Sequence, residues 1–338
     1  MQYKFILRLL FVLAIFFTRV SFAYTNDTSE FVATDTSEFK EINNTEVRSL
    51  VKTDNDPCAG CPNQDSGMLP WVLLSLGITV LAGIMVRFRS TRNLRGLFLL
   101  TSLLIFGFYR GACPCPISSF EDVFLLISGI KIPWQNLLWF LGLIPITYAL
   151  GKVWCGWVCH LGALQEFLFL PGKINWLKSS KAQRILRACR IILLVALVIQ
   201  LIITQTNVFC QFDPFKVAFN LISPHRIGWY LLGLLLLTSL FIYRPFCRAI
   251  CPIGLVLGWI SKIPKASAIG WKKECKKCPQ CSKCCKIHAI IELKESNSIN
   301  NNECIFCGNC LDGCRTGSIS FFRKSRSLIT TIFQKGTE

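Results

Sequence analysis

Two cysteine runs near the C-terminus decide the fold: Cys275-x-x-Cys278-x-x-Cys281-x-x-x-Cys285 and Cys304-x-x-Cys307-x-x-Cys310-x-x-x-Cys314. Each run has the spacing of a bacterial [4Fe-4S] motif, in which the fourth cysteine of one run ligates the other cluster. Zinc is the alternative, but a zinc site does not need the third cysteine that both runs repeat. The spacing therefore predicts one cluster on Cys275, Cys278, Cys281 and Cys314, and a second on Cys304, Cys307, Cys310 and Cys285.

The composition points to a membrane protein. Of the 338 residues, 52% are hydrophobic, and the mean hydropathy is +0.47. Since a helix that crosses a bilayer needs about 20 apolar residues, we expect about five spans in an α-helical integral membrane bundle over residues 68–262. The apolar runs are Leu69–Val86, Leu94–Tyr109, Leu137–Leu150, Ile191–Thr204 and Gly228–Tyr243.

The N-terminus has the features of a secretory signal peptide. Residues 1–23 contain Lys4 and Arg8, then an apolar stretch that ends in Ser21-Phe22-Ala23. We predict cleavage after Ala23, with an uncleaved sixth span as the alternative. Residues 24–67 are rich in Ser, Thr, Asn and acidic residues and form a predicted polar linker with a Cys-x-x-Cys pair.

Lysine and arginine indicate the orientation. They cluster after the first span, before the fourth span and after Tyr243. By the positive-inside rule these segments are cytoplasmic, so we expect a multi-pass protein of the cytoplasmic (inner) membrane with its N-terminal segment outside. The net charge of +18 mostly reflects this topology. The lysine-rich surface expected for the C-terminal domain suits membrane lipid or an acidic ferredoxin or flavodoxin as partner. Nucleic-acid binding is disfavoured because no stacking platform or helix-turn-helix accompanies the charge.

The membrane region repeats itself at an offset of 95 residues, so that Cys115 recurs as Cys210 and Trp134 as Trp229. Each unit has a helix running outward, an outer loop with a cysteine, a return helix and an inner Cys-x-x-x-Cys. We predict tandem parallel repeats of helix hairpins at about residues 94–165 and 190–257. A ferredoxin-like α+β domain is expected at 263–322, and a basic tail at 323–338.

Four cysteines of the repeats form a candidate inner site. The spacing i, i+4 puts both thiols of a pair on one side of a helix, and the repeat is expected to bring the two pairs together. A third [4Fe-4S] cluster, a single metal ion, reversible disulfides and purely structural cysteines all remain open. The four residues are Cys155, Cys159, Cys247 and Cys251.

A second group of cysteines is expected to face outside. Disulfides are the ordinary state of cysteines in an oxidising compartment. An outer cluster or metal site that gathers four of the five thiols is the sharper hypothesis. The residues are Cys58, Cys61, Cys113, Cys115 and Cys210.

The sequence disfavours a haem site, a nicotinamide site and a transport function. The chain has only three histidines, at positions that do not suggest a bis-histidine haem, and it lacks a Cys-x-x-Cys-His motif. No Gly-x-Gly-x-x-Gly follows a strand, which disfavours nicotinamide binding. A transporter, which the parallel repeat suggests, is disfavoured because we expect no Asp, Glu or Lys within the membrane.

Taken together, these features resemble the membrane-bound 4Fe-4S polyferredoxins of the NapH, NosR and MauN type, over roughly Met68 to Phe322. That family combines short spans, two Cys-x-x-x-Cys-Pro motifs at the cytoplasmic face and a C-terminal two-cluster ferredoxin. Here His160 replaces the first proline. The resemblance implies electron transfer between a quinol or cytoplasmic donor and an exported redox partner, such as a reductase, with quinone as a further cofactor.

The resemblance also implies an alternative, an assembly or regulatory factor that supplies reducing equivalents for the maturation of an exported metalloenzyme. In either case the chain is expected to be an electron-transfer subunit, such as a component of a quinol dehydrogenase, rather than a complete enzyme.

Overall fold

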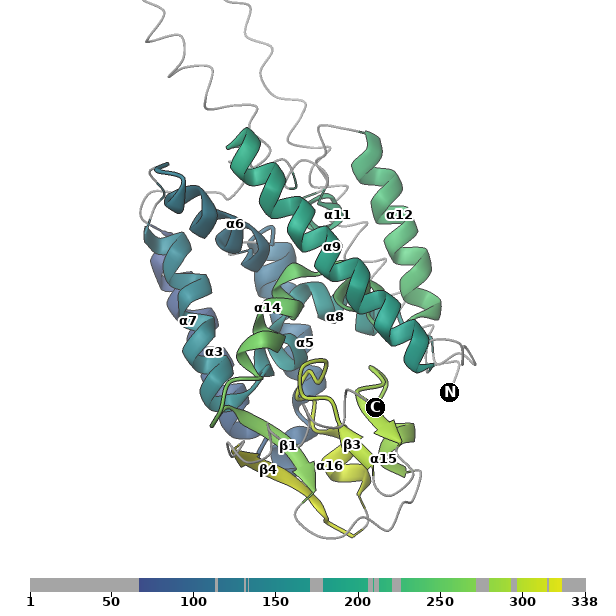
Figure 1. Cartoon of the computed structure of the whole chain (residues 1–338). Coiled ribbons are helices and arrows are strands. Elements are labelled where there is room, and N and C mark those ends of the chain that lie inside the picture. The colour runs from purple at the N-terminus through teal and green to yellow at the C-terminus, as the bar shows by residue number, and fades with distance from the viewer. Residues whose placement is uncertain are drawn as a thin grey trace, which may run out of the picture.

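The computed structural model describes residues 67–112, 115–130, 132, 134–170, 179–205, 209, 213–220, 226–271, 280–292, 297–314 and 316–323. A bundle of helices carries a small group of strands at one end (Figure 1). The predicted signal peptide, nearly all of the polar linker and the basic tail lie outside the described residues.

Five long helical segments coincide with the five apolar runs. Two of them, α3 and the Lys181–Thr204 part of α9, are long and apolar enough to cross a membrane, whereas Arg95–Tyr109 and Arg226–Phe241 are shorter apolar helices. The described chain is therefore helical with two candidate membrane spans, and five spans remain a prediction. The segments are α3 (Met68–Met85), α5 (Arg95–Ser102) continued by the π-helix η1 (Leu103–Tyr109), α7 (Trp134–Leu150), α9 (Ser180–Thr204) and α12 (Arg226–Phe241).

Helix α9 begins well before its apolar run. Ser179 is the N-cap, and its hydroxyl accepts the Lys181 N–H at 3.3 Å. The early turns carry Arg187 and Arg190, which pair with Glu303 in the C-terminal domain. An apolar run marks only the part of a helix that avoids charge, so it could not reveal this basic extension.

Short helices occupy the stretches between the long ones. Proline begins four of them, which suits its fixed φ and missing N–H. In Figure 1, α6 and α11 lie at the end of the bundle away from the strands. We had expected loops at these two places. The short helices are α4 (Arg89–Arg92), α6 (Pro116–Ile127), η2 (Trp154–Val158), α8 (His160–Leu168), α11 (Pro214–Asn220), α13 (Pro245–Ala249) and α14 (Pro252–Ile260).

The C-terminal region has the predicted α+β organisation. Strand β1 pairs antiparallel with β4, from Ser267 opposite Arg323 to Trp271 opposite Ile319, and β2 pairs antiparallel with β3. The β1–β4 pair brings the two ends of the region together, and α15 packs against α16 between them. The elements are β1 (Ser267–Trp271), α15 (Gln280–Cys284), β2 (Ile290–Glu292), β3 (Asn297–Ile299), α16 (Asn309–Gly313) and β4 (Ile319–Arg323).

Candidate iron–sulfur sites

The second predicted ferredoxin set comes together in the structure. Cys304, Cys307 and Cys310 lie on the segment that leads into α16, and Cys285 directly follows α15. Their thiols are close enough to interact electrostatically with one another. Gly308 has a φ of +87°, which glycine adopts without steric cost, so the chain can turn between Cys307 and Cys310.

Burial makes these thiols weak acids. It raises the pKa of Cys304 to about 12 and the pKa of Cys285 to about 11, in both cases with a further contribution from Cys307. The Ala289 N–H donates to Cys285 Sγ at 3.3 Å and so favours the thiolate form. Free thiols with these pKa values are protonated at neutral pH, and iron binding would displace the protons.

The first ferredoxin set is described only in part. Cys275 and Cys278 lie outside the described residues. Cys281 is buried on α15, and Cys314 follows α16. Because α15 packs against α16, the two described members come from neighbouring helices. This cluster site remains a prediction.

The four inner thiols gather between the two halves of the bundle. Cys155 lies on η2, Cys159 precedes α8, Cys247 lies on α13 and Cys251 precedes α14. Cys159 interacts electrostatically with the three others, and Cys247 and Cys251 both interact with Cys155. All four are free thiols. The structure therefore brings both Cys-x-x-x-Cys pairs to one place, from segments about 90 residues apart in the chain.

Helix N-termini point at the inner thiols. The Gly254 N–H in the first turn of α14 donates to Cys251 Sγ at 3.4 Å, and the Gly162 N–H makes the matching bond to Cys159 in α8. The side-chain amide of Gln165 lies 3.6 Å from Cys247 Sγ. Helix N-termini and N–H donors stabilise negative charge, so the surroundings favour anionic sulfur ligands.

The C-terminal domain docks directly onto the inner site. A Cβ on Gly156 would lie 2.1 Å from the Ile305 carbonyl oxygen, so only glycine permits this approach. Trp157 Nε1 donates to the Phe306 carbonyl at 3.1 Å. Gly156 follows Cys155, and Ile305 and Phe306 separate Cys304 from Cys307. The inner site and the second ferredoxin set thus share one tightly packed interface.

Lys152 joins three parts of the molecule at this interface. Its side chain is buried, and Nζ donates to the Gly254 carbonyl at 2.9 Å and to the Asn302 carbonyl at 2.8 Å. Gly254 belongs to the second half of the bundle and Asn302 to the C-terminal domain. The ammonium therefore fixes the first repeat against both neighbours and places a positive charge near the cysteines.

Glu303 anchors the domain to α9. Its carboxylate accepts from Arg187 Nε at 3.1 Å and from Arg190 Nη2 at 2.5 Å. Burial alone would raise the pKa of Glu303, but the attraction of Arg190, with Lys152 and Arg187, outweighs burial and holds this pKa below its usual range. A lowered pKa means that the contact stabilises docking at neutral pH and loses this contribution as the pH falls through that pKa.

We predict that Glu303→Gln weakens docking at pH 7 by about 3 kcal/mol, because it leaves Arg190 buried without its counter-ion. Hydrogen exchange of residues 302–307 measures this loss, and the pH dependence of their protection should flatten in the variant. Asp312→Asn is the matched control. Asp312 is 36% exposed in its pair with Arg92, so its loss should cost below about 1 kcal/mol. Equal protection in Glu303→Gln and the unaltered protein would contradict the prediction.

Most of the outer cysteines lie outside the described residues. Cys58, Cys61, Cys113 and Cys210 lie outside the described residues. Cys115 precedes α6 and is buried, and its thiol interacts with Asp213 and Lys216, which lie at the start of α11. The structure thus places one thiol of this group beside a carboxylate and an ammonium, and the outer site remains a prediction.

Buried acids inside the bundle were missed by the sequence analysis. Glu121, Asp122 and Asp213 are buried in α6 and before α11, and Glu166 pairs with two arginines in the middle of the bundle. None of the four lies in the five apolar runs, so the expectation of no Asp, Glu or Lys within the membrane remains a prediction. The sequence signal for the buried ion pair was the lone Glu166 in the apolar stretch that follows His160.

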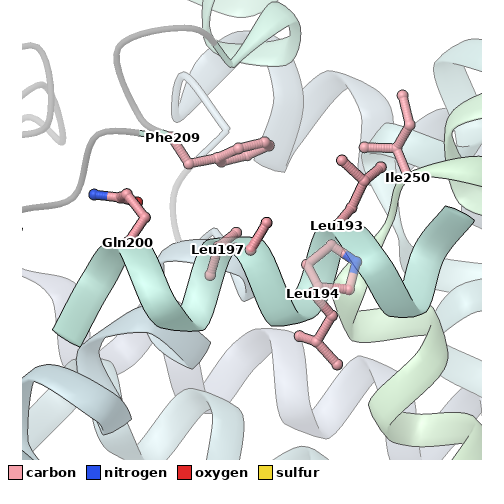
Figure 2. A pocket seen from close by; sticks show the side chains of 8 residues that line it. Leu193, Leu194, Leu197, Gln200, Phe209 and Ile250 are labelled. Atoms are coloured by element: carbon pink, nitrogen blue, oxygen red, sulfur yellow. The ribbon is translucent and has the colours of Figure 1, made fainter. Parts of the chain in front are cut away.

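A pocket of about 270 Å³ lies beside the second inner pair. Figure 2 shows Leu193, Leu194, Leu197 and Gln200 on α9, with Phe209 and Ile250 across from them. Among the described residues that line the pocket, Gln200 alone has a polar side chain. Ile250 and Pro252, which also lines the pocket, flank Cys251 in the chain, so the pocket lies next to the segment that carries this thiol.

Comparison with known proteins supports iron–sulfur chemistry in the two segments that carry the Cys-x-x-x-Cys pairs. A family described as 4Fe-4S binding domain matches residues 132–179 and 228–269. Each matched stretch contains one Cys-x-x-x-Cys pair and ends before Cys275, the first cysteine of the ferredoxin runs. The same family thus recognises both halves of the inner site.

Three relatives illustrate the range of similarity. An uncharacterized protein of Methanocaldococcus jannaschii is 26% identical over 64% of this chain and 90% of its own length. Regulatory protein NosR of Pseudomonas aeruginosa is 30% identical over 71% of this chain, which covers 35% of NosR. Ferredoxin-type protein NapH of Escherichia coli is 25% identical over 51% of this chain and 63% of NapH. No solved structure gives a significant match.

The converging thiols, the candidate spans and the matched domains define a membrane-associated iron–sulfur protein that transfers electrons. The chain matches a 4Fe-4S binding domain family and is similar to NosR and NapH, which belong to the membrane-associated polyferredoxins, as the sequence predicts. It spans about a third of NosR, and the activities of the longer relatives are therefore not assigned to it.

Proposed function

We propose that this protein passes electrons between a quinol or cytoplasmic donor and an exported redox partner. The observation that carries the proposal is the docking of the Cys304–Cys307 loop on η2. Gly156 touches the Ile305 carbonyl, so Cys155 and Cys307 lie on the two sides of one packed interface. When bound, [4Fe-4S] clusters supply one-electron transfer at such positions.

The inner thiols suit a third [4Fe-4S] cluster. All four cysteines are free thiols in the structure, the form that can ligate iron once deprotonated. A single zinc ion needs its sulfur ligands about 3.8 Å apart, but no three Cys, His, Asp or Glu side chains within the described residues converge closely enough to hold one ion. Four thiols that interact with one another, with N–H donors and Lys152 around them, fit an anionic cluster.

The proposed topology places the ferredoxin clusters and the outer cysteines on opposite sides of the inner membrane. The basic segments and the ferredoxin domain would face the cytoplasm by the positive-inside rule. Cys115 and the other outer cysteines would then face the exported partner, as disulfides or as a metal site. Five spans in two parallel repeats, with residues 1–23 as a cleaved signal peptide, complete this arrangement.

The pocket beside Cys251 is our candidate for the quinol site. Its lining is almost entirely apolar, and it borders α9, whose Ile199, Ile202 and Ile203 side chains are exposed on the bundle surface. A lipid-soluble carrier could therefore enter from the bilayer and reach the neighbourhood of the inner thiols. Gln200 would offer the carrier a polar contact.

We predict that Leu197→Trp, which fills this pocket, lowers quinol-driven reduction of the clusters at least about tenfold, equivalent to about 1.4 kcal/mol of lost binding. Reduction by dithionite should be unchanged, because that reagent does not need the pocket. Ile203→Trp is the matched control, since Ile203 lies on the same helix but is 75% exposed and outside the pocket. Equal quinol rates in the two variants would remove the pocket from the proposal.

The name of one relative favours a second function. NosR is described as a regulatory protein, which agrees with the alternative of an assembly or regulatory factor that supplies electrons for the maturation of an exported metalloenzyme. Steady-state kinetics separates the two. Sustained turnover with quinol and an external acceptor supports electron transfer to an exported partner. Reduction that stops once every cluster has accepted one electron supports the maturation factor.

A further inference from the structure

Three charged side chains are buried together beside the inner thiols. Arg95 donates from Nη1 and Nη2 to the two Glu166 carboxylate oxygens at 2.8 and 2.7 Å, and Arg244 Nη2 donates to Glu166 Oε2 at 2.6 Å. The side chains are 10%, 13% and 1% exposed, in the order Arg95, Glu166 and Arg244. Two arginines and one glutamate leave one positive charge in excess.

The triad holds the thiol-bearing backbone. Arg95 Nε donates to the Gly156 carbonyl at 2.9 Å, and Arg244 Nη1 donates to the Cys155 carbonyl. A Cβ on Gly162 would lie 2.8 Å from Arg244 Nη1, so the guanidinium fits against a helix turn that has no side chain. Arg244 also has a φ of +51°, a conformation that costs a residue with a side chain about 1–2 kcal/mol.

Stability alone does not explain this arrangement. Buried ion pairs contribute little compared with apolar residues of the same size, because removing charges from water is costly. The sequence repeat offers a clue. Arg244 stands three residues before Cys247, as Lys152 stands three residues before Cys155. Each cation reaches a backbone carbonyl of the opposite half, Cys155 for Arg244 and Gly254 for Lys152.

Arg244 also lies within electrostatic reach of the thiols of Cys159 and Cys247. A cluster held by four thiolates is anionic, and reduction adds one further negative charge. A buried cation beside it stabilises the reduced form more than the oxidised form, because screening is weak in the protein interior. A buried anion at the same place has the opposite effect.

We propose that Arg244 sets the reduction potential of the inner cluster to a higher value, that Glu166 limits this effect, and that Arg95 holds Glu166 in place. The inference rests on the proposed third cluster. It assigns to these residues the control of the cluster's reduction potential, whereas the four cysteines serve as its ligands. Arg244 is a positioning residue for electron transfer, acting on the cluster through its charge.

The test is a redox titration of the full-length, anaerobically purified protein, followed by electron paramagnetic resonance of the inner cluster. Arg244→Gln should shift the midpoint to lower potential by at least about 59 mV, a tenfold change for a one-electron couple. Glu166→Gln should shift it to higher potential, and Arg244→Lys should leave it near the original value. Arg110→Gln is the control, since Arg110 lies at the far end of η1, over Trp71, and should cause no shift.

Opposite shifts in Arg244→Gln and Glu166→Gln support the inference, because damage to the fold would not change sign with the charge removed. No shift, or shifts in the same direction, overturns it. If the Arg244→Gln variant does not assemble its inner cluster, the titration of Glu166→Gln alone decides the question. A higher midpoint potential then supports the inference, and an unchanged midpoint potential refutes it. Unaltered protein without an inner-cluster signal overturns the proposed third cluster and this inference together.

Discussion

Replacing Cys247 with alanine is expected to leave the ferredoxin-type clusters filled and to stop their reduction by quinol. The substitution removes one of four inner thiols and should lower iron per chain from about 12 to about 8, the content of two cubes. Because loss of a supporting residue around a metal ligand already costs about 10- to 100-fold, we expect quinol-driven reduction to fall at least about 100-fold. Iron analysis and rapid-mixing absorbance measure the two effects.

The matched control is Cys189→Ala. Cys189 is an exposed free thiol on α9, so its loss should change neither iron content nor rate. Dithionite should still bleach the ferredoxin clusters of Cys247→Ala, which shows that the domain is intact. Full quinol reactivity in Cys247→Ala would mean that electrons reach the ferredoxin clusters without passing the inner site.

A single methyl group at Gly156 is expected to separate the C-terminal domain from the bundle. The added Cβ would lie 2.1 Å from the Ile305 carbonyl oxygen, and backbone cannot give way as a flexible side chain can. Overpacking usually costs 1–3 kcal/mol, and a backbone clash should bring Gly156→Ala to about 3 kcal/mol or more. We expect faster hydrogen exchange at residues 302–307 and slower electron exchange between the two sites, with iron content nearly unchanged.

Gly233→Ala is the matched control for this substitution. Gly233 lies within α12, and a Cβ there would meet nothing within 4 Å. Alanine in a helix interior is favoured over glycine by about 0.5–1 kcal/mol, so the control should be neutral or slightly stabilising. If Gly156→Ala exchanges hydrogen as slowly as Gly233→Ala, the docking described here is wrong.

The sequence predicts the parts of the site that depend on cysteine spacing. The two ferredoxin runs anticipate the grouping of Cys285 with Cys304, Cys307 and Cys310, although these lie on separate elements. The internal repeat anticipates that Cys155 and Cys159 meet Cys247 and Cys251. In both cases a local spacing that recurs in the chain implies a shared centre, which is a statement about long-range contact that a single motif could not make.

The rest depends on tertiary packing that leaves no periodic signal. Nothing in the spacing of Arg95, Glu166 and Arg244 indicates that they form one buried triad, because their contacts join three elements. The sequence also gives no sign that Gly156 packs against Ile305, because a glycine by itself indicates only a flexible backbone. The helices α6 and α11 were expected as loops because proline and short length hide their turns.

The central claim is that the duplicated inner thiols hold a third cluster next to the ferredoxin pair. Iron and acid-labile sulfide per chain, measured on anaerobically purified full-length protein, test it most directly. The account predicts about 12 of each, from three cubes. A value of about 8 of each would contradict it, since the ferredoxin cysteines alone account for that amount.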